Sequence, residues 1–330
     1  MPYHVGRWSR RQVLRASVGA GLGILLEGCA SYPVFRGLSN AQWNGPTGPC
    51  ERWALLSDPH ISEDPETAFG RANMAAHLCC AVSDVVQRSA ASPSDARAPM
   101  AGVIVNGDCA FEFGRAGDYA TFTELLVDPV SRAGVPLHLT LGNHDHHEHF
   151  HEALIDYARP QSGDALALDG RFATIIRGQC ANFFLLDTLD ERYILAGGIG
   201  ERQLDWLAGA LERFKDRPAI VVGHHPIDPE PDLLGQNTSM LDAKPFWNVL
   251  TRFPHVKAYV FGHTHRWDVR RRDGIYLVNL PSTAYTFEAG QPQGWVEMWL
   301  DGKGARLQLH HITAGSMMPS ASDSAVLRWA

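Results

Sequence analysis

The segment Leu137–Asp145 reads LHLTLGNHD, an apolar run followed at once by a glycine and a group of polar side chains. The first four residues have the composition of a buried strand. Asn143, His144 and Asp145, which follow Gly142, are of types that bind metal ions or move protons. Because histidine-rich stretches also occur on loop surfaces, this segment needs support from the rest of the chain.

The same arrangement of an apolar run followed by polar residues recurs at four other places. These are Trp53–Leu56 before SDPH, with Asp58 and His60; Gly102–Val105 before NGDC, with Asp108; Ala219–Val222 before GHHP, with His224 and His225; and Ala258–Phe261 before GHTH, with His263 and His265. Ligands collect beyond the carboxyl ends of strands in open α/β sheets, so the five loops are expected to converge. Residues two apart in an extended segment point to one side. Asp58 and His60 are therefore predicted to reach toward one point, and so are His263 and His265.

The remaining pattern predicts a mixed, layered α/β fold. Further strands are expected at Phe183–Leu186 and Ile275–Val278, and helices at Ala68–Val86, Tyr119–Val127 and Glu201–Phe214. A hairpin is expected around Asp301-Gly302, so strand–helix alternation gives way to strand pairing late in the chain. We interpret the basic run Arg270–Arg272 as a solvated turn between strands, and the tail from Ala314 as unstructured.

The first thirty residues have the features of a targeting segment. Ser9–Ser17 reads SRRQVLRAS, a twin-arginine pattern, and the apolar run Ala16–Leu26 is too short to span a bilayer. We therefore expect a signal for twin-arginine-type export at residues 1–30, a linker at 31–50, one domain at 51–313 and a tail at 314–330. The alternative is a buried N-terminal helix with two chance arginines. Cys29, in LLEGC, resembles a lipoprotein cleavage site, so both a lipid anchor and an ordinary signal-peptidase cut stay open. The expected location is periplasmic or extracytoplasmic.

Composition excludes some partners. The chain has 330 residues, of which 45% are hydrophobic and 20% charged, as in ordinary soluble globular proteins. Its net charge of -7 argues against a nucleic-acid partner. The cysteines show no CxxC pair and no zinc-ribbon spacing, and we expect Cys79 and Cys80 to be buried thiols on one helix.

The polar residues at the strand ends form a set of metal ligands without a thiolate. They are Asp58, His60, Asp108, Asn143, His224, His263 and His265. Such a mixture suits iron, manganese or zinc in an open catalytic site. Seven ligands are too many for one tetrahedral ion and fit two ions that share a carboxylate, an arrangement that typically serves in-line displacement at phosphorus. Two divalent ions outweigh two carboxylates and a hydroxide, so the site would attract an anion.

Taken together and in this order, DPH, NGD, GNHD, GHHP and GHTH resemble the calcineurin-like metallophosphoesterases over about Trp53 to Ile312. The set looks most like the branch that contains cyclic-nucleotide and glycerophosphodiester phosphodiesterases. The resemblance implies a four-layer α/β/β/α sandwich of two mixed sheets with a dinuclear centre. The related purple acid phosphatases have a tyrosine ligand near the second motif, whereas Cys109 and Ala110 follow Asp108 here, which argues against that subgroup.

The resemblance also implies a role for each site residue. One ion would be held by Asp58, His60, Asp108 and His265, and the other by Asp108, Asn143, His224 and His263. His144 would protonate the leaving alkoxide or stabilise charge on phosphorus, and Asp145 would orient the imidazole of His144. The remaining histidines have other interpretations. His146, His147, His149 and His151 are expected in a solvated loop or helix start, or at the rim as contacts to substrate. His225 is expected to contact phosphate or to support His224, and His310 and His311 are interpreted as structural.

The leading hypothesis is an exported dinuclear-metal phosphoesterase that cleaves small-molecule phosphoesters through a metal-bridged hydroxide, with diesters favoured. The alternatives are a phosphomonoesterase of the same family, an exported metal-binding protein without turnover, and a metallohydrolase of another class. The second of these leaves His144 and Asp145 without a role, and the third predicts a zinc site with a general-base glutamate, for which no HExxH helix is visible. Substrate choice is expected to depend on the loops Ile61–Phe69, Phe111–Tyr119, His146–Phe150 and Ile227–Met240.

Overall fold

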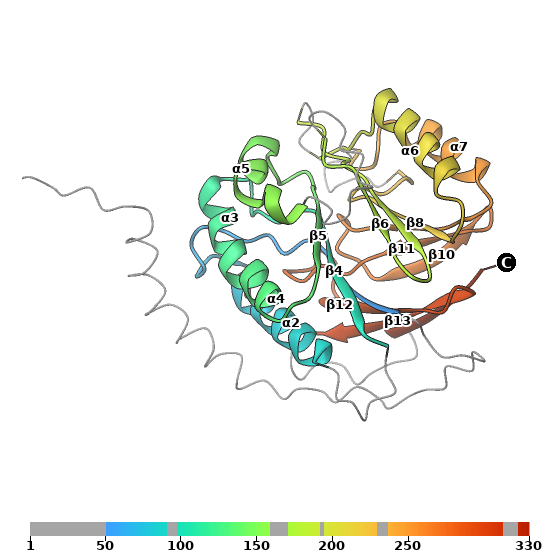
Figure 1. Ribbon diagram of the computed structural model, residues 1–330. Helices are drawn as coiled ribbons and strands as arrows, with labels where there is room; N and C mark the ends of the chain where they lie inside the picture. Colours follow the sequence, from blue (N-terminus) through green and yellow to red (C-terminus); the bar gives the residue numbers. More distant parts are fainter. Residues whose placement is uncertain are drawn as a thin grey trace, which may run out of the picture.

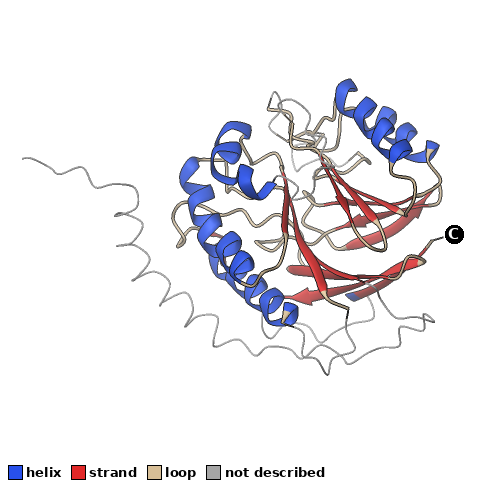
Figure 2. Cartoon of the chain, in the orientation of Figure 1, coloured by secondary structure: helices blue, strands red, loops and turns tan. Residues whose placement is uncertain are grey.

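The computed structural model describes residues 51–90, 98–158, 171–191, 195–229, 237–312 and 323–329. The expected export signal, the linker and Cys29 lie outside these residues. Two six-stranded sheets pack face to face, and helices cover the outer face of each (Figures 1 and 2). The strand orders are β14-β13-β12-β1-β4-β5 and β10-β11-β9-β8-β7-β6. The expected four-layer α/β/β/α sandwich of two mixed sheets is confirmed.

The first sheet contains parallel and antiparallel strands. Its parallel part comprises β1 (Glu51–Leu56), β4 (Met100–Asn106) and β5 (Leu137–Thr140), and its antiparallel part comprises β12 (Gly294–Leu300), β13 (Gly304–His311) and β14 (Ser324–Arg328). Its helical layer comprises α2 (Met74–Ser89), α3 (Ala116–Phe122), the π-helical turn η1 (Thr123–Val127), α4 (Asp128–Arg132) and α5 (His147–Ala158). A short hairpin of β2 (Ala68–Phe69) and β3 (Ala72–Asn73) precedes α2.

The second sheet has a parallel centre with antiparallel edges. Its parallel strands are β7 (Asn182–Leu185), β8 (Ala219–Val222), β9 (Val256–Phe261) and β11 (Ile275–Asn279), and its edge strands are β6 (Thr174–Arg177) and β10 (Asp268–Arg272). The helices α6 (Glu201–Arg213) and α7 (Ala243–Arg252) cover its outer face. No helix among the described residues is long and apolar enough to cross a membrane.

Burial on both faces explains why the strands were recognisable as continuous apolar runs. In β1, Leu55 packs between the two sheets, whereas Ala54 and Leu56 point to the helical layer. Every residue of β1 is therefore buried, as is typical of strands that are covered on both sides. Three apolar layers result, one between the sheets and one under each set of helices.

Several expectations about individual elements are wrong. Arg270–Arg272 belongs to the edge strand β10, and the turn follows it at Asp273-Gly274. The tail is not wholly irregular, because Ser324–Arg328 forms β14 against β13. Helix α2 begins at Met74 and not at Ala68, since Asn73 caps it through a bond from the Ala76 N–H to the Asn73 side chain. The hairpin around Asp301-Gly302 is confirmed.

Candidate metal centre

The five polar loops converge at one end of the two sheets, as expected. Asp58, Asp108 and His144 follow strands of the first sheet, and His224, His263 and His265 follow strands of the second. The contact between His60 and His265 joins residues 205 positions apart. The candidate centre therefore lies at the seam between the sheets.

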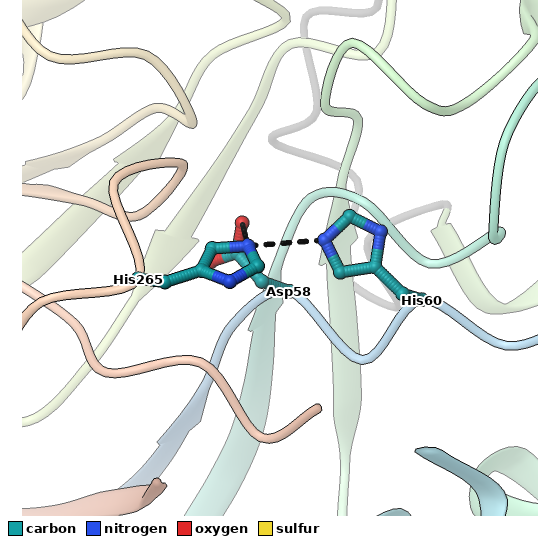
Figure 3. Close-up of side chains that lie close together, drawn as sticks. All are labelled: Asp58, His60 and His265. Atoms are coloured by element: carbon teal, nitrogen blue, oxygen red, sulfur yellow. Dashed lines mark hydrogen bonds and ion pairs between the residues drawn. The ribbon is translucent and has the colours of Figure 1, made fainter. Parts of the chain in front are cut away.

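Three groups of side chains bring their potential ligand atoms within 4.8 Å of one another: Asp58, His60 and His265; His60, Asp108 and His144; and Asp108, His224 and His263. The first group points toward a common point in Figure 3. Asp108 belongs to two of the groups, and its Oδ2 lies 3.2 Å from His224 Nε2 and 3.6 Å from His60 Nε2. The carboxylate therefore stands between the two other ligand sets, where a shared ligand is needed.

The hydrogen bonds of two imidazoles leave nitrogen lone pairs aimed at the centre. Nδ1 of His224 donates to the carbonyl oxygen of Asn106 at 2.8 Å, and Nδ1 of His265 donates to that of Tyr285 at 2.7 Å. A neutral ring then carries its lone pair on Nε2. Nε2 of His224 is buried without a hydrogen-bond partner and faces a carboxylate. A lone pair that faces a carboxylate is stabilised by a proton or a metal ion between them, so these residues fit metal ions.

The pKa values of the histidine and aspartate side chains also indicate a metal site. Burial lowers the pKa of His60 and of His263 to about 3, which keeps both rings neutral. Burial alone would raise the pKa of Asp58, but the charges of His265 and His224 lower it to about 2. Burial opposes a proton on His224, yet Asp108 and Asp58 raise its pKa to about 9. A bound cation would take the place of that proton, since metal ligands must be deprotonated.

The ligand-bearing loops have unusual backbone conformations. Asp58, His60, Asp108, His263 and His265 all have φ between 48° and 67°. Side chains other than glycine adopt this left-handed region at a cost, and such residues cluster at functional sites. Asp58 and His60 converge as expected, but not because the segment is extended, since both residues have left-handed backbone conformations. The two histidines of GHTH also belong to different groups of ligand atoms. His263 lies in the group that contains His224, and His265 lies in the group that contains Asp58.

Two glycines admit the close approach of the loops. Gly107 has φ of 76°, and a Cβ there would lie 2.5 Å from His224 Nδ1. A Cβ on Gly142 would lie 2.2 Å from Asp108 Oδ1, so only glycine fits. Asn143 follows Gly142 directly, and its Oδ1 is buried. Its role as a metal ligand stays a prediction.

Asp145 does not orient the ring of His144 as expected. Its carboxylate accepts hydrogen bonds from the N–H groups of Cys109, Ala110 and Gly142 and from the hydroxyl of Tyr119. Its acceptor sites are thereby used to tie the NGD and GNHD loops together, while Nδ1 of His144 has no partner among the described residues. Burial and the charge of Asp108 raise the pKa of Asp145 to about 6.

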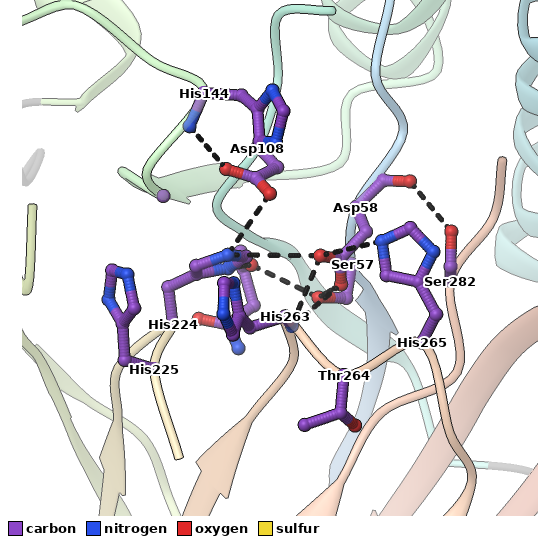
Figure 4. A network of polar contacts seen from close by, with 12 residues as sticks. Ser57, Asp58, Asp108, His144, His224, His225, His263, Thr264, His265 and Ser282 are labelled. Atoms are coloured by element: carbon purple, nitrogen blue, oxygen red, sulfur yellow. Dashed lines mark hydrogen bonds and ion pairs between the residues drawn. The ribbon is translucent and has the colours of Figure 1, made fainter. Parts of the chain in front are cut away.

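Other supporting residues were not identified from the sequence. Ser57 donates to Asp58, and Ser282 Oγ donates to the Asp58 carbonyl at 2.9 Å (Figure 4). The Asn106 side chain donates to the Gly223 carbonyl at 3.2 Å, which joins the two sheets beneath the site. Thr188 lies 2.8 Å from Nδ1 of His225. The only signal for Ser57 and Asn106 was their position directly beside a motif.

Several of the remaining histidines have structural partners. His147 begins α5 and bonds to Asp187 at 2.8 Å and to Glu191 at 2.9 Å, so it connects the two halves of the fold. His225 is buried against the rings of His224 and His263. His310 and His311 pair with Glu297 and Asp323, in agreement with their structural interpretation.

Comparison with known proteins agrees with the site. The family model of the calcineurin-like phosphoesterases matches residues 52–267. The chain is 27% identical over 191 residues to a probable cyclic nucleotide phosphodiesterase of Psychrobacter sp. (strain PRwf-1), covering 57% of this chain and 53% of the relative. It is 29% identical over 138 residues to the 3′,5′-cyclic adenosine monophosphate phosphodiesterase CpdA of Vibrio vulnificus (strain CMCP6), covering 39% and 50%. The chain thus spans about half the length of these two curated relatives.

Among solved structures, the fold is similar to that of a dimetal phosphatase from Danio rerio. The TM-score is 0.64 at 15% identity, and the match covers 86% of this chain and 100% of the other. This likeness concerns the fold alone.

Proposed function

Since this chain belongs to the calcineurin-like phosphoesterase family, we propose that it is an exported metal-dependent hydrolase of small-molecule phosphoesters that prefers diesters to monoesters. The position of Asp108 carries the proposal, because its carboxylate is shared by two groups of ligand atoms at the seam of the sheets. The names of the relatives support the diester preference.

Two sets of side chains would each hold one ion. Asp58, His60 and His265 would bind the first, and Asn143, His224 and His263 would bind the second, with Asp108 between them. Iron, manganese and zinc all suit this donor set. Two such ions would supply an activated water and neutralise the phosphoryl oxygens.

His144 would act on the leaving group. Its backbone N–H donates to Asp108 Oδ1 at 2.8 Å, so the loop is held at the bridging carboxylate. Its ring meets the edge of the His60 ring, with centroids 4.8 Å apart. A half-buried imidazole at this position can transfer a proton to the departing alkoxide, a role that accelerates such steps by about 10²–10⁴.

Two observations support export. Residues 1–30 contain the twin-arginine pattern and the apolar run described above. Cys180 is disulfide-bonded. Disulfides persist mainly in oxidising compartments outside the cytoplasm. Lipid analysis of the purified protein would test for a lipid anchor on Cys29.

The test is an assay with bis(p-nitrophenyl) phosphate and p-nitrophenyl phosphate after reconstitution with manganese, zinc or iron. The proposal predicts metal-dependent cleavage with a higher kcat/KM for the diester. A higher kcat/KM for the monoester would reassign the protein as a phosphatase. Absence of cleavage of both, with two ions bound, would favour a metal-binding protein without turnover.

A further inference from the structure

Two exposed phenylalanines lie beside the metal-binding residues. Phe69 is 48% exposed and Phe287 is 63% exposed. Both rings stack on aromatic residues at the site. The Phe287 ring lies 4.4 Å from that of His265, with 24° between the planes, and the Phe69 ring lies 4.2 Å from that of Tyr285, also at 24°.

Tyr285 connects the two phenylalanines to the centre. Its ring stacks on His60 at 5.1 Å and meets the edge of Phe287 at 5.6 Å. Phe69, Tyr285 and Phe287 therefore form a continuous aromatic shelf next to the ligands of the first ion. Phe69 lies against Tyr285, and Phe287 lies against His265. The exposed part of each phenylalanine ring faces solvent.

Hydrogen bonds fix the backbone of the shelf at Ala284 and Tyr285. The Tyr285 carbonyl accepts from His265, and the N–H of Tyr285 donates to Ser282 Oγ at 3.3 Å. The neighbouring Ala284 carbonyl accepts from His77 at 2.7 Å and from Gln293 at 2.9 Å. A preformed surface loses little conformational freedom when a ligand binds to it.

The His60 ring connects the shelf to His144, the proposed proton donor. The His60 ring contacts both Tyr285, at 5.1 Å, and His144, at 4.8 Å. His225, by contrast, contacts the rings of the second group, and Figure 4 shows it on the opposite side from His265. A group attached to the departing oxygen would therefore extend toward the shelf.

We propose that the aromatic shelf binds a planar ring on the leaving alcohol of a phosphodiester, by stacking on Phe69 and Phe287. This inference rests on the proposed phosphodiesterase function and adds a substrate class to it. Flat rings gain from offset stacking on an exposed aromatic face, whereas an aliphatic alcohol such as glycerol offers no such face. The ring can be a nucleobase or an aryl group, which share this chemistry.

The first test compares Phe287→Ala, Phe287→Leu and Phe287→Tyr in the manganese-loaded full chain. The substrates are 3′,5′-cyclic AMP, methyl p-nitrophenyl phosphate and the aliphatic diester glycerophosphoethanolamine. Loss of one stacking ring should lower kcat/KM for a ring-bearing diester roughly 10-fold in the Ala and Leu variants. Phe287→Tyr should retain wild-type kcat/KM, and the aliphatic diester should change less than about twofold in every variant. Val326→Ala, which removes an apolar side chain that is 56% exposed on β14, is the control.

Each other result has a definite meaning. An equal loss on all three diesters would show that Phe287 only supports His265, and no loss on any would show that it binds nothing; both overturn the proposal. Retention of activity by the Leu variant would indicate an apolar chain in place of a ring and would also overturn it. A loss confined to cyclic AMP identifies a nucleobase as the ring, and a loss confined to the nitrophenyl diester identifies an aryl group.

A second test separates the shelf from the proposed activity. Calorimetric titration of the metal-loaded chain with 5′-AMP, phenyl phosphate and glycerol 3-phosphate measures ring binding without turnover. The shelf predicts a roughly 10-fold lower Kd for at least one ring-bearing ligand, which Phe287→Ala abolishes. If no diester is cleaved but this difference is present, the proposed function fails and the shelf stands. If diesters are cleaved without any ring preference in either test, the shelf fails and the function stands.

Discussion

Asp108 and His224 follow strands of different sheets and face each other with Oδ2 and Nε2 3.2 Å apart. Because Nδ1 of His224 is used by the Asn106 carbonyl, the nitrogen that faces the carboxylate has no proton to donate in the neutral ring. In the metal-free chain a proton on His224 can bridge this pair, because the nearby carboxylates raise the pKa of His224 to about 9. A bound cation would take the place of that proton and join the two sheets.

Replacing Asp108 by Asn should empty both metal positions, since the amide has no negative charge to share between two ions. We expect metal content to fall from two ions per chain to below one, with activity lower by more than the 10- to 100-fold typical of supporting residues. Elemental analysis and diester assays on the same sample measure this. Retention of two ions would show that Asp108 does not bridge.

His144→Ala separates catalysis from metal binding. If His144 delivers the proton, kcat should fall about 10²–10⁴-fold while two ions stay bound. The control is His151→Ala, which removes an exposed imidazole nearby in the sequence. Unchanged turnover, or a parallel loss of metal, would contradict a proton-transfer role.

Tyr119→Phe tests the connection between loops. The buried hydroxyl donates to Asp145 Oδ1 at 3.1 Å and accepts from the His146 N–H at 2.8 Å, and burial raises the pKa of Tyr119 so that it stays protonated. We expect a loss of about 1 kcal/mol in unfolding free energy and about 10-fold in kcat. The control is Tyr276→Phe. The Tyr276 hydroxyl accepts from the Arg328 N–H far along the second sheet, so its removal should leave kcat unchanged.

The sequence predicted the parts of the fold and site whose signal is local. Apolar strands buried on both faces, and the polar residues directly after them, could be recognised because neighbours in sequence carry the information. Strand β10 could not, since an exposed edge strand of arginines lacks an apolar pattern. The partners of Asp145 could not either, because Ala110 and Cys109 are 35 and 36 positions away. The left-handed backbone conformations of five ligands, with φ between 48° and 67°, were not predicted either.

Glu297→Ala should destabilise the protein without affecting the site. Glu297 pairs with Arg52 at 2.6 Å, and both side chains are fully buried. Removing one partner leaves an unpaired buried charge, which typically costs about 3–5 kcal/mol. Chemical denaturation measures the loss, and Glu212→Ala, which removes an exposed pair with Lys215, is the control with no resolvable change. A small effect at Glu297 would mean that water reaches Arg52.

Acid should destabilise the fold partly through His138. Burial lowers the pKa of His138 from 6.5 to about 4, so the unfolded chain binds this proton more readily than the folded one. The associated stability is complete above pH 6.5 and is lost as the pH falls from 6.5 toward 4. His138→Gln should therefore flatten the pH dependence of unfolding free energy in that window, whereas His151→Gln should not. Identical profiles for both variants would contradict this assignment.

The most direct test of the central claim is anomalous diffraction from crystals of the manganese-loaded protein. Two peaks about 3.5–4 Å apart are expected, one contacted by Asp58, His60 and His265, the other by Asn143, His224 and His263, with Asp108 between them. A single peak, or peaks away from these residues, would contradict a two-metal centre at the seam of the sheets.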